Sequence, residues 1–492
     1  MSASAGWSFL LVEGISRPGR LLGRDVAGPS IWLVNIALLY ILNPSVAASI
    51  PARVGADSSR VSLLHLVRVG LLGQGEPQVP YPTATLDSGD CRGGRETSRW
   101  RVADGGGAVM SSTGGVVPFT VDVSADVLTD LRYRIDKTRS VHPAVLDGGE
   151  NPWVASRIDE CLAYWRTGFD WDAQQARLNA FPQFRAIVDG VGVHFVHVRG
   201  VGPHPLPLLL TNGWPSSFVE YLGLIGPLTD PARHGADPRD CFDVVMPALP
   251  GYGFTDHCRD RNLTRLTAAA LFDQLMTDVL GYDRYVVHGD DIGGGVANRL
   301  GMMKPDRLRA IQTANWITPD LDLRDPSVSE AEGDYAKAEG EWDERHGAYA
   351  HVQRTRPHTL AVGLNDSPAG LAAWLIEKFL TWSDPATRHT LTDDLLLTNA
   401  TLYWVTQTIE SSVRLYALPA VAPSKVVVPS YVVVANEPSL PHPPRSLLER
   451  LYDDLRGVDR VEQGGHFLAV EAPDALVGLI RRNLSPHRGI NL

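Results

Sequence analysis

The chain has 492 residues, of which 44% are hydrophobic, and its formal net charge at pH 7 is −11. This length gives room for two or three domains and a large buried core, so the default class is a soluble globular enzyme. The acidic balance and the absence of any run of basic residues argue against a partner made of nucleic acid.

Residues 1–109 differ in composition from the rest, because they contain no lysine and are rich in Gly, Ser, Pro and Arg. The apolar run from Ile31 to Leu42 is shorter than the roughly 20 residues that a spanning helix needs, and its leader is long for a signal peptide. Residues 86–115 hold too few apolar side chains to pack. We therefore expect residues 1–109 to be disordered or to lie outside a working protein that starts near Met110. The alternative is that the apolar run anchors a real extension to a membrane.

Residues 110–200 are expected to form an N-terminal arm that leads into the core. Residues 118–138 have the pattern of a short strand followed by a helix with one apolar face, and residues 155–183 continue with helical spacing. Residues 184–200 alternate apolar and polar side chains on either side of Asp189 and Gly190, which predicts a hairpin.

Neither histidines nor cysteines form a recognisable metal motif. His194 and His197 are three residues apart in a predicted strand and therefore face opposite sides. The cysteines lie far apart, and we expect free thiols and a reducing, cytoplasmic compartment. The four are Cys91, Cys161, Cys241 and Cys258.

From Pro207 onward, apolar strands alternate with helices, which predicts an α/β fold with a mostly parallel sheet. Residues 201–316 are expected to form the first part of this core and residues 421–492 the last part, with strands within 425–437 and 459–476. Residues 317–420 interrupt the alternation with a helical segment, interpreted as a cap. Ligand sites in such sheets lie at the carboxyl ends of the strands.

The stretch from Asp283 to Leu300 reads as a strand, a glycine-rich turn and a helix, which is the local context of a nucleophile elbow. Such a turn strains its central residue, so only very small residues fit just before and after it. Centred on Asp291, these positions are Gly289, Gly293 and Gly294. Asp291 is therefore the candidate nucleophile.

An aspartate nucleophile needs a base that activates water against the ester it forms, and the base needs an orienting acid. His466 follows a predicted strand and two glycines, and Glu437 follows the preceding strand. The order Asp291, Glu437, His466 matches the order of nucleophile, acid and histidine in α/β-hydrolases.

Dense and ordered motifs over residues 116 to about 485 resemble the microsomal type of epoxide hydrolase, which has an N-terminal arm, an α/β-hydrolase core and a helical cap. The matching segments include FDWDAQQARLNAFPQF, LLLTNGWPSSFVEY, GDDIGGGVANRLG, RTRPHTLAVGLNDSPAGLAAWLIEKF and GGHFLAVEAP.

The resemblance implies that a small epoxide is converted to a vicinal diol with water, without a metal or an organic cofactor. It assigns Asp291 as nucleophile and His466 as base, and it places the oxyanion site at the backbone amides of Trp214 and Ile292. Two cap tyrosines, at Tyr349 and Tyr416, are expected to protonate the epoxide oxygen, because a neutral phenol can donate at neutral pH. Tyr403 is expected only to pack within the cap. The one protein partner expected is a second copy of the chain, in a homodimer.

Three positions depart from the family pattern. Asn212 and Asp290 stand where members usually carry histidine and glycine, and an extra carboxylate at Asp290 would raise the pKa of Asp291 by repulsion. The loop that carries Glu437 is about one residue short, so another cap or core carboxylate is the alternative acid, with Asp453 and Asp454 less well placed because they are expected on a helix.

Two other functions remain as alternatives. A haloalkane dehalogenase shares the aspartate nucleophile but needs halide-binding donors in place of paired phenols. A catalytically silent protein of the same fold would keep the pocket for binding alone, and only Asn212 and Asp290 support it.

Overall fold

The computed structural model describes residues 115–139, 141, 151–258, 264–314, 321–418 and 425–489. The expectations for residues 1–109 lie outside these ranges. Within the described ranges, none of the helices combines the length and the apolar character needed to cross a membrane.

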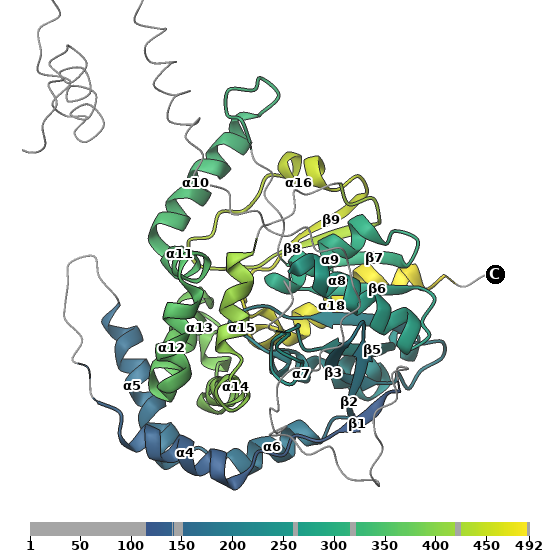
Figure 1. The fold of residues 1–492 in the computed structure, drawn as a ribbon. Helices are drawn as coiled ribbons and strands as arrows, with labels where there is room; N and C mark the ends of the chain where they lie inside the picture. The colour runs from purple at the N-terminus through teal and green to yellow at the C-terminus, as the bar shows by residue number, and fades with distance from the viewer. Residues whose placement is uncertain are drawn as a thin grey trace, which may run out of the picture. The chain divides into compact units, whose positions relative to one another are not determined.

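One nine-stranded sheet, in the order β1-β2-β3-β5-β4-β6-β7-β8-β9, forms the centre of the described residues (Figure 1). Strands β1, β2, β3 and β5 pair antiparallel, and all pairs from β5 to β9 are parallel, as the alternating pattern predicts. The strands are β1 (Val117–Phe119), β2 (Gln183–Val188), β3 (Val191–Val198), β4 (Leu206–Thr211), β5 (Phe242–Pro247), β6 (Tyr285–Gly289), β7 (Leu308–Thr313), β8 (Ser430–Val434) and β9 (Leu455–Arg460).

Helices cover this sheet in three groups. The first group precedes β2 and consists of α4 (Ala125–Asp136), α5 (Pro152–Thr167) and α6 (Trp171–Asn179). The core helices are α7 (Leu222–Thr229), α8 (Arg265–Gln274) with the π-helical η5 (Leu275–Val279), α9 (Ile292–Met303), α16 (Arg445–Leu451), α17 (Leu468–Glu471) and α18 (Pro473–Leu484). The third group is α10 (Glu330–His346), α11 (Ala348–Thr355), α12 (Pro357–Asp366), α13 (Pro368–Trp382), α14 (Asp393–Thr406) and α15 (Ile409–Arg414).

Short 3-10 turns complete the described elements. They are η2 (Phe218–Tyr221), η3 (Pro231–His234), η4 (Pro238–Asp240), η6 (Arg388–Thr390), η7 (Leu415–Ala417) and η8 (Ser485–Arg488).

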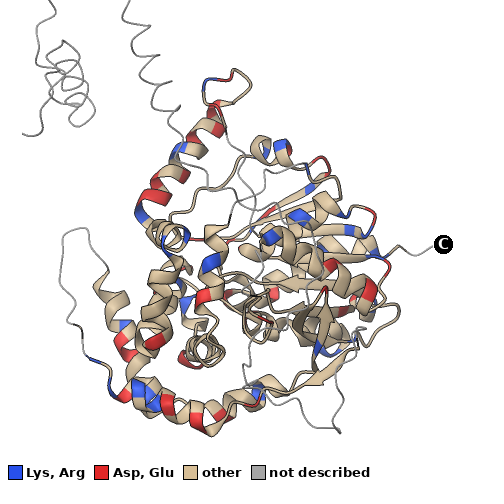
Figure 2. Ribbon diagram, in the orientation of Figure 1, with Lys and Arg blue, Asp and Glu red and all other residues tan. Residues whose placement is uncertain are grey.

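Helices α10 to α15 gather on one side of the molecule, beside the strands (Figure 1). Charged residues, most of them acidic, lie along α10 (Figure 2), as expected for a helix with a solvated face. The capping box of Ser329 and Glu332 fixes the start of α10, because each side chain bonds the backbone N–H of the other residue.

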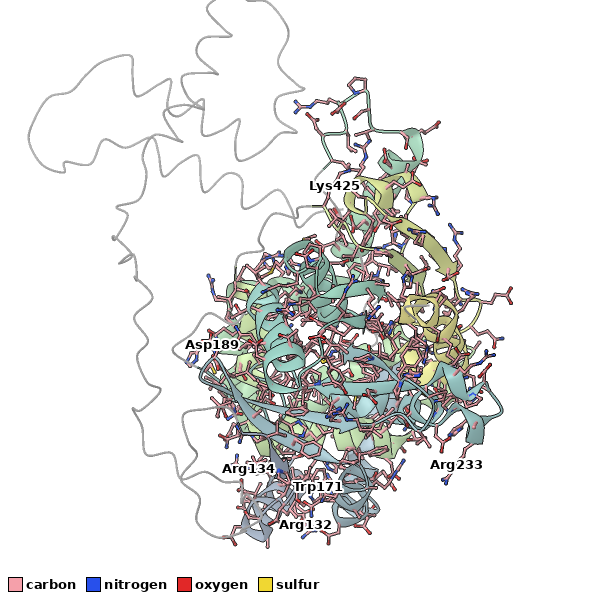
Figure 3. All side chains as sticks on the ribbon, turned by 90° about the vertical axis from the view of Figure 1, so that its right-hand side faces the viewer. Arg132, Arg134, Trp171, Asp189, Arg233 and Lys425 are labelled. Carbon is pink, nitrogen blue, oxygen red and sulfur yellow. The ribbon has the colours of Figure 1, made fainter. Side chains whose placement is uncertain are left out.

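The first helix group packs through the apolar face that the sequence predicts on α4, where Leu128, Leu131 and Ile135 are buried. Arg134 of α4 bonds the Asp366 carboxylate at the end of α12 at 2.8 Å, and Figure 3 labels this arginine together with Trp171. Trp171 is only 4% exposed and packs in the buried core.

The hairpin predicted around Asp189 and Gly190 is present as β2 and β3. Both turn residues have positive φ, 46° and 73°, and this matches the right-handed twist of paired strands.

The last strand begins earlier than the sequence predicts. We expected it within residues 459–476, whereas β9 spans Leu455–Arg460. This strand pairs only with β8 and is half-buried or exposed along its length, so it needs no apolar run and leaves little hydrophobic signal. Asp453 and Asp454 lie in the turn before β9, so their predicted placement on a helix is wrong.

The register of the parallel strands sets where the loops meet. Thr211 at the end of β4 pairs with Gly289 at the end of β6, so the segments that follow leave the sheet side by side. Strands β8 and β9, two and three places beyond β6 in the sheet, have their carboxyl ends on the same side. The loops after these four strands carry Trp214, Asp291, Glu437 and His466, whereas Tyr349 and Tyr416 lie in α11 and η7.

Candidate active site

The turn after β6 holds Asp291 in a strained conformation, with φ 50° and ψ −120°, at the N-cap of α9. Neighbouring backbone leaves no room for side chains here. A Cβ on Gly289 would lie 2.3 Å from the Gly293 carbonyl oxygen, and one on Gly293 would lie 1.9 Å from that of Thr211. The small-residue rule that selects Asp291 therefore has a direct steric cause.

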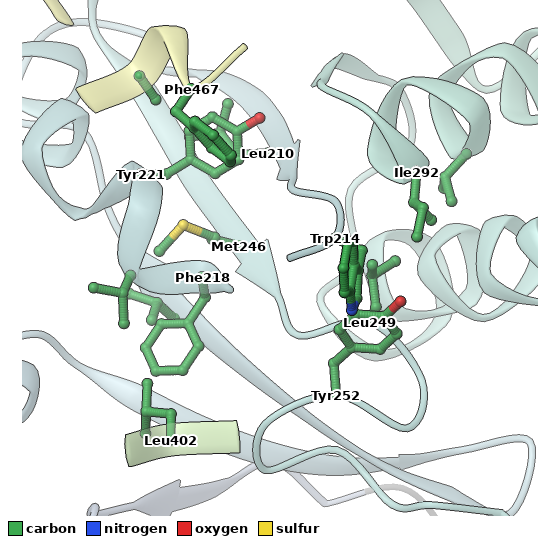
Figure 4. Packing of buried hydrophobic residues seen from close by; sticks show 14 of the residues in the cluster. Leu210, Trp214, Phe218, Tyr221, Met246, Leu249, Tyr252, Ile292, Leu402 and Phe467 are labelled. Atoms are coloured by element: carbon green, nitrogen blue, oxygen red, sulfur yellow. The ribbon is translucent and has the colours of Figure 1, made fainter. Parts of the chain in front are cut away.

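Two backbone amides hold one oxygen of Asp291. The N–H groups of Ile292 and Trp214 donate to Oδ1 at 2.6 and 3.0 Å. Gly213 lets the Trp214 segment come this close, because a Cβ there would lie 2.2 Å from Oδ1. The structure thus brings the two amides of the expected oxyanion site onto one oxygen of Asp291, and Figure 4 shows Trp214 and Ile292 among the buried apolar side chains.

The second oxygen of Asp291 faces His466. Oδ2 lies 3.7 Å from Nε2 of His466, and Nδ1 of the same ring is hydrogen-bonded to Oε2 of Glu437 at 2.7 Å. The three side chains predicted as a triad therefore lie together, with His466 between Asp291 and Glu437, despite the short loop at Glu437. Asp453 and Asp454 lie elsewhere, since Asp453 pairs with Lys425 and Asp454 with Arg456.

Charge surrounds the mostly buried His466 ring. Burial lowers the pKa of His466, but the charge and hydrogen bond of Glu437 and the charge of Asp291 outweigh burial and raise the pKa to about 10. The free site therefore favours an imidazolium between two carboxylates at neutral pH.

Aromatic rings line the site on the cap side. The Tyr349 ring of α11 stacks on Trp214 with centroids 5.3 Å apart and an interplanar angle of 7°. Tyr416 of η7 lies 6.0 Å from both rings, edge-on to each. Burial first, and then neighbouring charge including that of Asp291, raises the pKa of both phenols, so both stay protonated at neutral pH. Tyr403 instead donates to the Ser216 carbonyl at 2.9 Å and is buried, as its predicted packing role requires.

The two side chains that depart from the family pattern are buried beside the nucleophile. Asn212 donates from Nδ2 to the Gly213 carbonyl at 3.0 Å. Asp290 accepts a bond from the Tyr221 hydroxyl at 2.7 Å, and its other oxygen lies 3.1 Å from Nε2 of His288. Burial and the charge of Asp290 raise the pKa of the nearby Glu220 to about 8. The effect of Asp290 on Asp291 stays a prediction.

Two buried carboxylates that sequence reasoning missed position the His466 loop. Glu471 accepts bonds from the N–H groups of Gly465 and Phe467, on either side of His466, and from that of Asp384. Asp384 in turn accepts from the Gly464 N–H and from Asn436, next to Glu437, each at 3.0 Å. The only signal for Glu471 was its place in the GGHFLAVEAP segment.

No cluster of His, Cys, Asp and Glu suited to a metal ion occurs in the described part of the chain. A small hollow behind the triad is lined by its three residues together with Asp290, Ala314, Val434, Ala435, Leu440 and His442. The carboxylates and histidines among these residues offer hydrogen-bond partners to a water molecule.

Comparison with known proteins decides the family. The family model described as "Epoxide hydrolase N terminus" matches residues 116–221. A putative epoxide hydrolase of Stigmatella aurantiaca is 36% identical over 367 residues, which cover 73% of this chain and 82% of that protein. The chain belongs to the epoxide hydrolase family. Epoxide hydrolase 1 of Oryctolagus cuniculus is 31% identical over 406 residues, covering 74% of this chain and 89% of that protein.

Solved structures of epoxide hydrolases share the fold. The juvenile hormone epoxide hydrolase of Bombyx mori matches with a TM-score of 0.68 and 29% identity, over 76% of this chain and 95% of that one. The Aspergillus niger epoxide hydrolase matches with a TM-score of 0.64 and 27% identity, over 75% and 95% of the two chains. These matches confirm the predicted α/β-hydrolase fold and family.

The bonding of Glu471 predicts a loss of both stability and turnover in Glu471→Gln. The amide group would place a donor against backbone N–H donors, and each buried group left unpaired costs about 1–3 kcal/mol. Urea denaturation should show a lower free energy of unfolding, and epoxide turnover should fall because the His466 loop loosens. Glu462→Gln, at an exposed position of the same loop, is the matched control. Equal stability in the two variants would contradict this role.

Proposed function

We propose that this epoxide hydrolase converts a small epoxide and water to a vicinal diol through a covalent ester on Asp291. The observation that carries the proposal is that the two carboxylate oxygens of Asp291 have different surroundings. Backbone amides hold Oδ1, while Oδ2 accepts no such bond from them and lies 3.7 Å from Nε2 of His466. Such a carboxylate has one oxygen free to attack and one held for the later oxyanion.

In the first step, Oδ2 of Asp291 attacks an epoxide carbon, and the carbon–oxygen bond of the ring breaks. Tyr349 and Tyr416 both donate hydrogen bonds to the departing oxygen, and one of them transfers its proton to it. Their phenols lie beside Trp214 and feel the charge of Asp291, which supports their placement at the reacting centre. Positioned proton donors typically contribute ~10²- to 10⁴-fold to the rate.

In the second step, His466 removes a proton from water, which attacks the ester carbonyl. The amides of Trp214 and Ile292 then stabilise negative charge on Oδ1. Glu437 supports this step by holding Nδ1 and balancing the charge of the imidazolium. Collapse of the intermediate releases the diol and restores Asp291.

The loss of charge on Asp291 prepares His466 for the second step. The Asp291 charge is one cause of the raised pKa of His466, and it disappears when the ester forms. The pKa of His466 then falls, so the ring becomes a more available base once there is an ester to hydrolyse.

Paired phenols favour epoxide opening over dehalogenation. A halide leaves without a proton, so a dehalogenase gains nothing from two protonated tyrosines over the nucleophile. Turnover of styrene oxide without release of halide from chloro- or bromoalkanes is the expected result. Turnover of neither substrate class by folded protein would favour a silent binding protein.

Asp291→Ala should abolish turnover, and His466→Gln should trap the ester, because attack needs only the carboxylate while hydrolysis needs the base. Intact-mass spectrometry should show His466→Gln protein heavier by one substrate. A single turnover of the unaltered enzyme in oxygen-18 water should place unlabelled oxygen in the diol. Label in the diol on that first turnover would rule out the covalent route.

Replacing Tyr349 or Tyr416 by Phe should slow ester formation, and the double change should slow it more, with ester hydrolysis less affected in each case. The expected loss from a positioned donor is ~10²-fold or more. Rapid-quench mass spectrometry separates the two rates. Tyr403→Phe, in the same cap but outside the site, is the control. Unchanged ester formation in both single variants would assign the acid role to other residues.

The pKa of His466 should be lower in Asp291→Asn than in the unaltered enzyme, because the amide removes one of the charges that raise it from its usual value to about 10. In the ester, hydrolysis should accelerate as pH rises through this lowered pKa and then level off. NMR titration of nitrogen-15-labelled histidine and the pH profile of ester hydrolysis measure the two effects. An equal pKa in both proteins would contradict the coupling.

A further inference from the structure

A lysine of the cap lies against the ring of one proposed acid. Lys378 Nζ of α13 sits over the Tyr349 ring, 4.9 Å from its centroid. The same ammonium lies 5.9 Å from the Trp374 ring and 5.8 Å from the Trp382 ring. Its side chain is 11% exposed, so three aromatic rings surround a largely desolvated cation.

Helical spacing explains this cage. Trp374, Lys378 and Trp382 follow each other at intervals of four residues on α13 and therefore share one face of the helix. That face meets α11, where Tyr349 and Gln353 are also four residues apart. The Trp374 Nε1–H donates to Gln353 Oε1 at 3.2 Å, which fixes α11 and α13 against each other at the cage.

The environment of Tyr349 makes a nearby cation useful. Burial and the charge of Asp291 raise the pKa of Tyr349, which keeps the phenol protonated but also makes it a poorer proton donor. A cation on the ring face is attracted to the π electrons, and more strongly as negative charge develops on the phenol oxygen. Lys378 also forms an ion pair with Glu377, which is the more exposed of the two. This ion pair weakens the attraction between the ammonium and the Tyr349 ring without removing it.

We propose that Lys378 is a positioning residue that strengthens Tyr349 as the acid in epoxide opening. This rests on the proposed function of Tyr349. The ammonium transfers no proton itself; the proton moves from the Tyr349 hydroxyl toward the epoxide oxygen as that oxygen leaves carbon. The role concerns the first step only, because ester hydrolysis depends on His466.

The test compares Lys378→Met, which keeps the length and apolar stem, with Lys378→Arg, which keeps the charge and can stack in the cage. Ester formation is measured by rapid-quench mass spectrometry with 1,2-epoxypropane and 3,3,3-trifluoro-1,2-epoxypropane. The fluorinated alkoxide is less basic and needs less help from an acid. We expect Lys378→Met to slow ester formation from 1,2-epoxypropane by about 3- to 30-fold and from the fluorinated epoxide by less. Lys378→Arg should restore most of the rate.

Two controls separate charge from packing. Glu377→Gln leaves the ammonium on the ring and removes its partner carboxylate, so ester formation should be unchanged or faster. In a Tyr349→Phe background, Lys378→Met should cause no further loss, because the acid it serves is gone. An equal loss for both epoxides, or the same loss in the Tyr349→Phe background, would overturn the inference and leave Lys378 as a packing residue.

The failure of the proposed function would look different. If Tyr349→Phe alone leaves ester formation unchanged, Tyr349 is not the acid, and the inference falls with it. If Tyr349→Phe slows the step and Lys378→Met does not, only the role of Lys378 is overturned.

Discussion

The site depends on the strained turn that holds Asp291. A residue with a side chain rarely adopts φ 50° with ψ −120°, and such strain typically costs about 1–3 kcal/mol. The pairing of β4 with β6 holds the turn in this conformation, because the backbone at the ends of the two strands lies very close to the turn. The strain exposes the carboxylate at the sheet edge and points its Oδ1 at two backbone amides.

Electrostatics organises the second half of the site. His466 lies between Asp291 and Glu437, so its affinity for a proton depends on whether Asp291 carries charge. A histidine that was an unprotonated base throughout the cycle would not need a second carboxylate beside it. Here the free site holds the proton tightly, and in the proposed cycle the ester itself weakens that hold. The timing of base catalysis is thus linked to the covalent state of the nucleophile.

Local rules were enough to find the residues that occupy special backbone positions. The glycines around Asp291 and the paired glycines before His466 mark turns. Because these turns follow predicted strands, they are expected at the carboxyl ends of a parallel sheet, where ligand sites lie. Glu437 was found from its order along the chain and its place after a strand. Strand β9 was misplaced because an edge strand that is only half-buried leaves no clear apolar pattern.

Residues that act through long-range contacts left no such mark. Glu471 looks like a surface charge on a short helix, yet it bonds backbone groups of the His466 loop and of the segment after α13. Lys378 looks like a solvated helix position, and only the packing of α11 against α13 shows that its ammonium is enclosed by rings. Sequence spacing predicts a helix face but not its partner.

The seam between the end of α13 and the His466 loop limits how the cap can move. His466 donates its N–H to the Trp382 carbonyl at 3.1 Å, and Asp384 bonds the Gly464 N–H. A cap that swung open as a rigid lid about any distant hinge would break these bonds and carry the base away from the nucleophile. Substrate entry and product exit must therefore use motions that leave this end of α13 in place. The cap is fixed to the core on this side, and only its other parts are free to move to admit substrate.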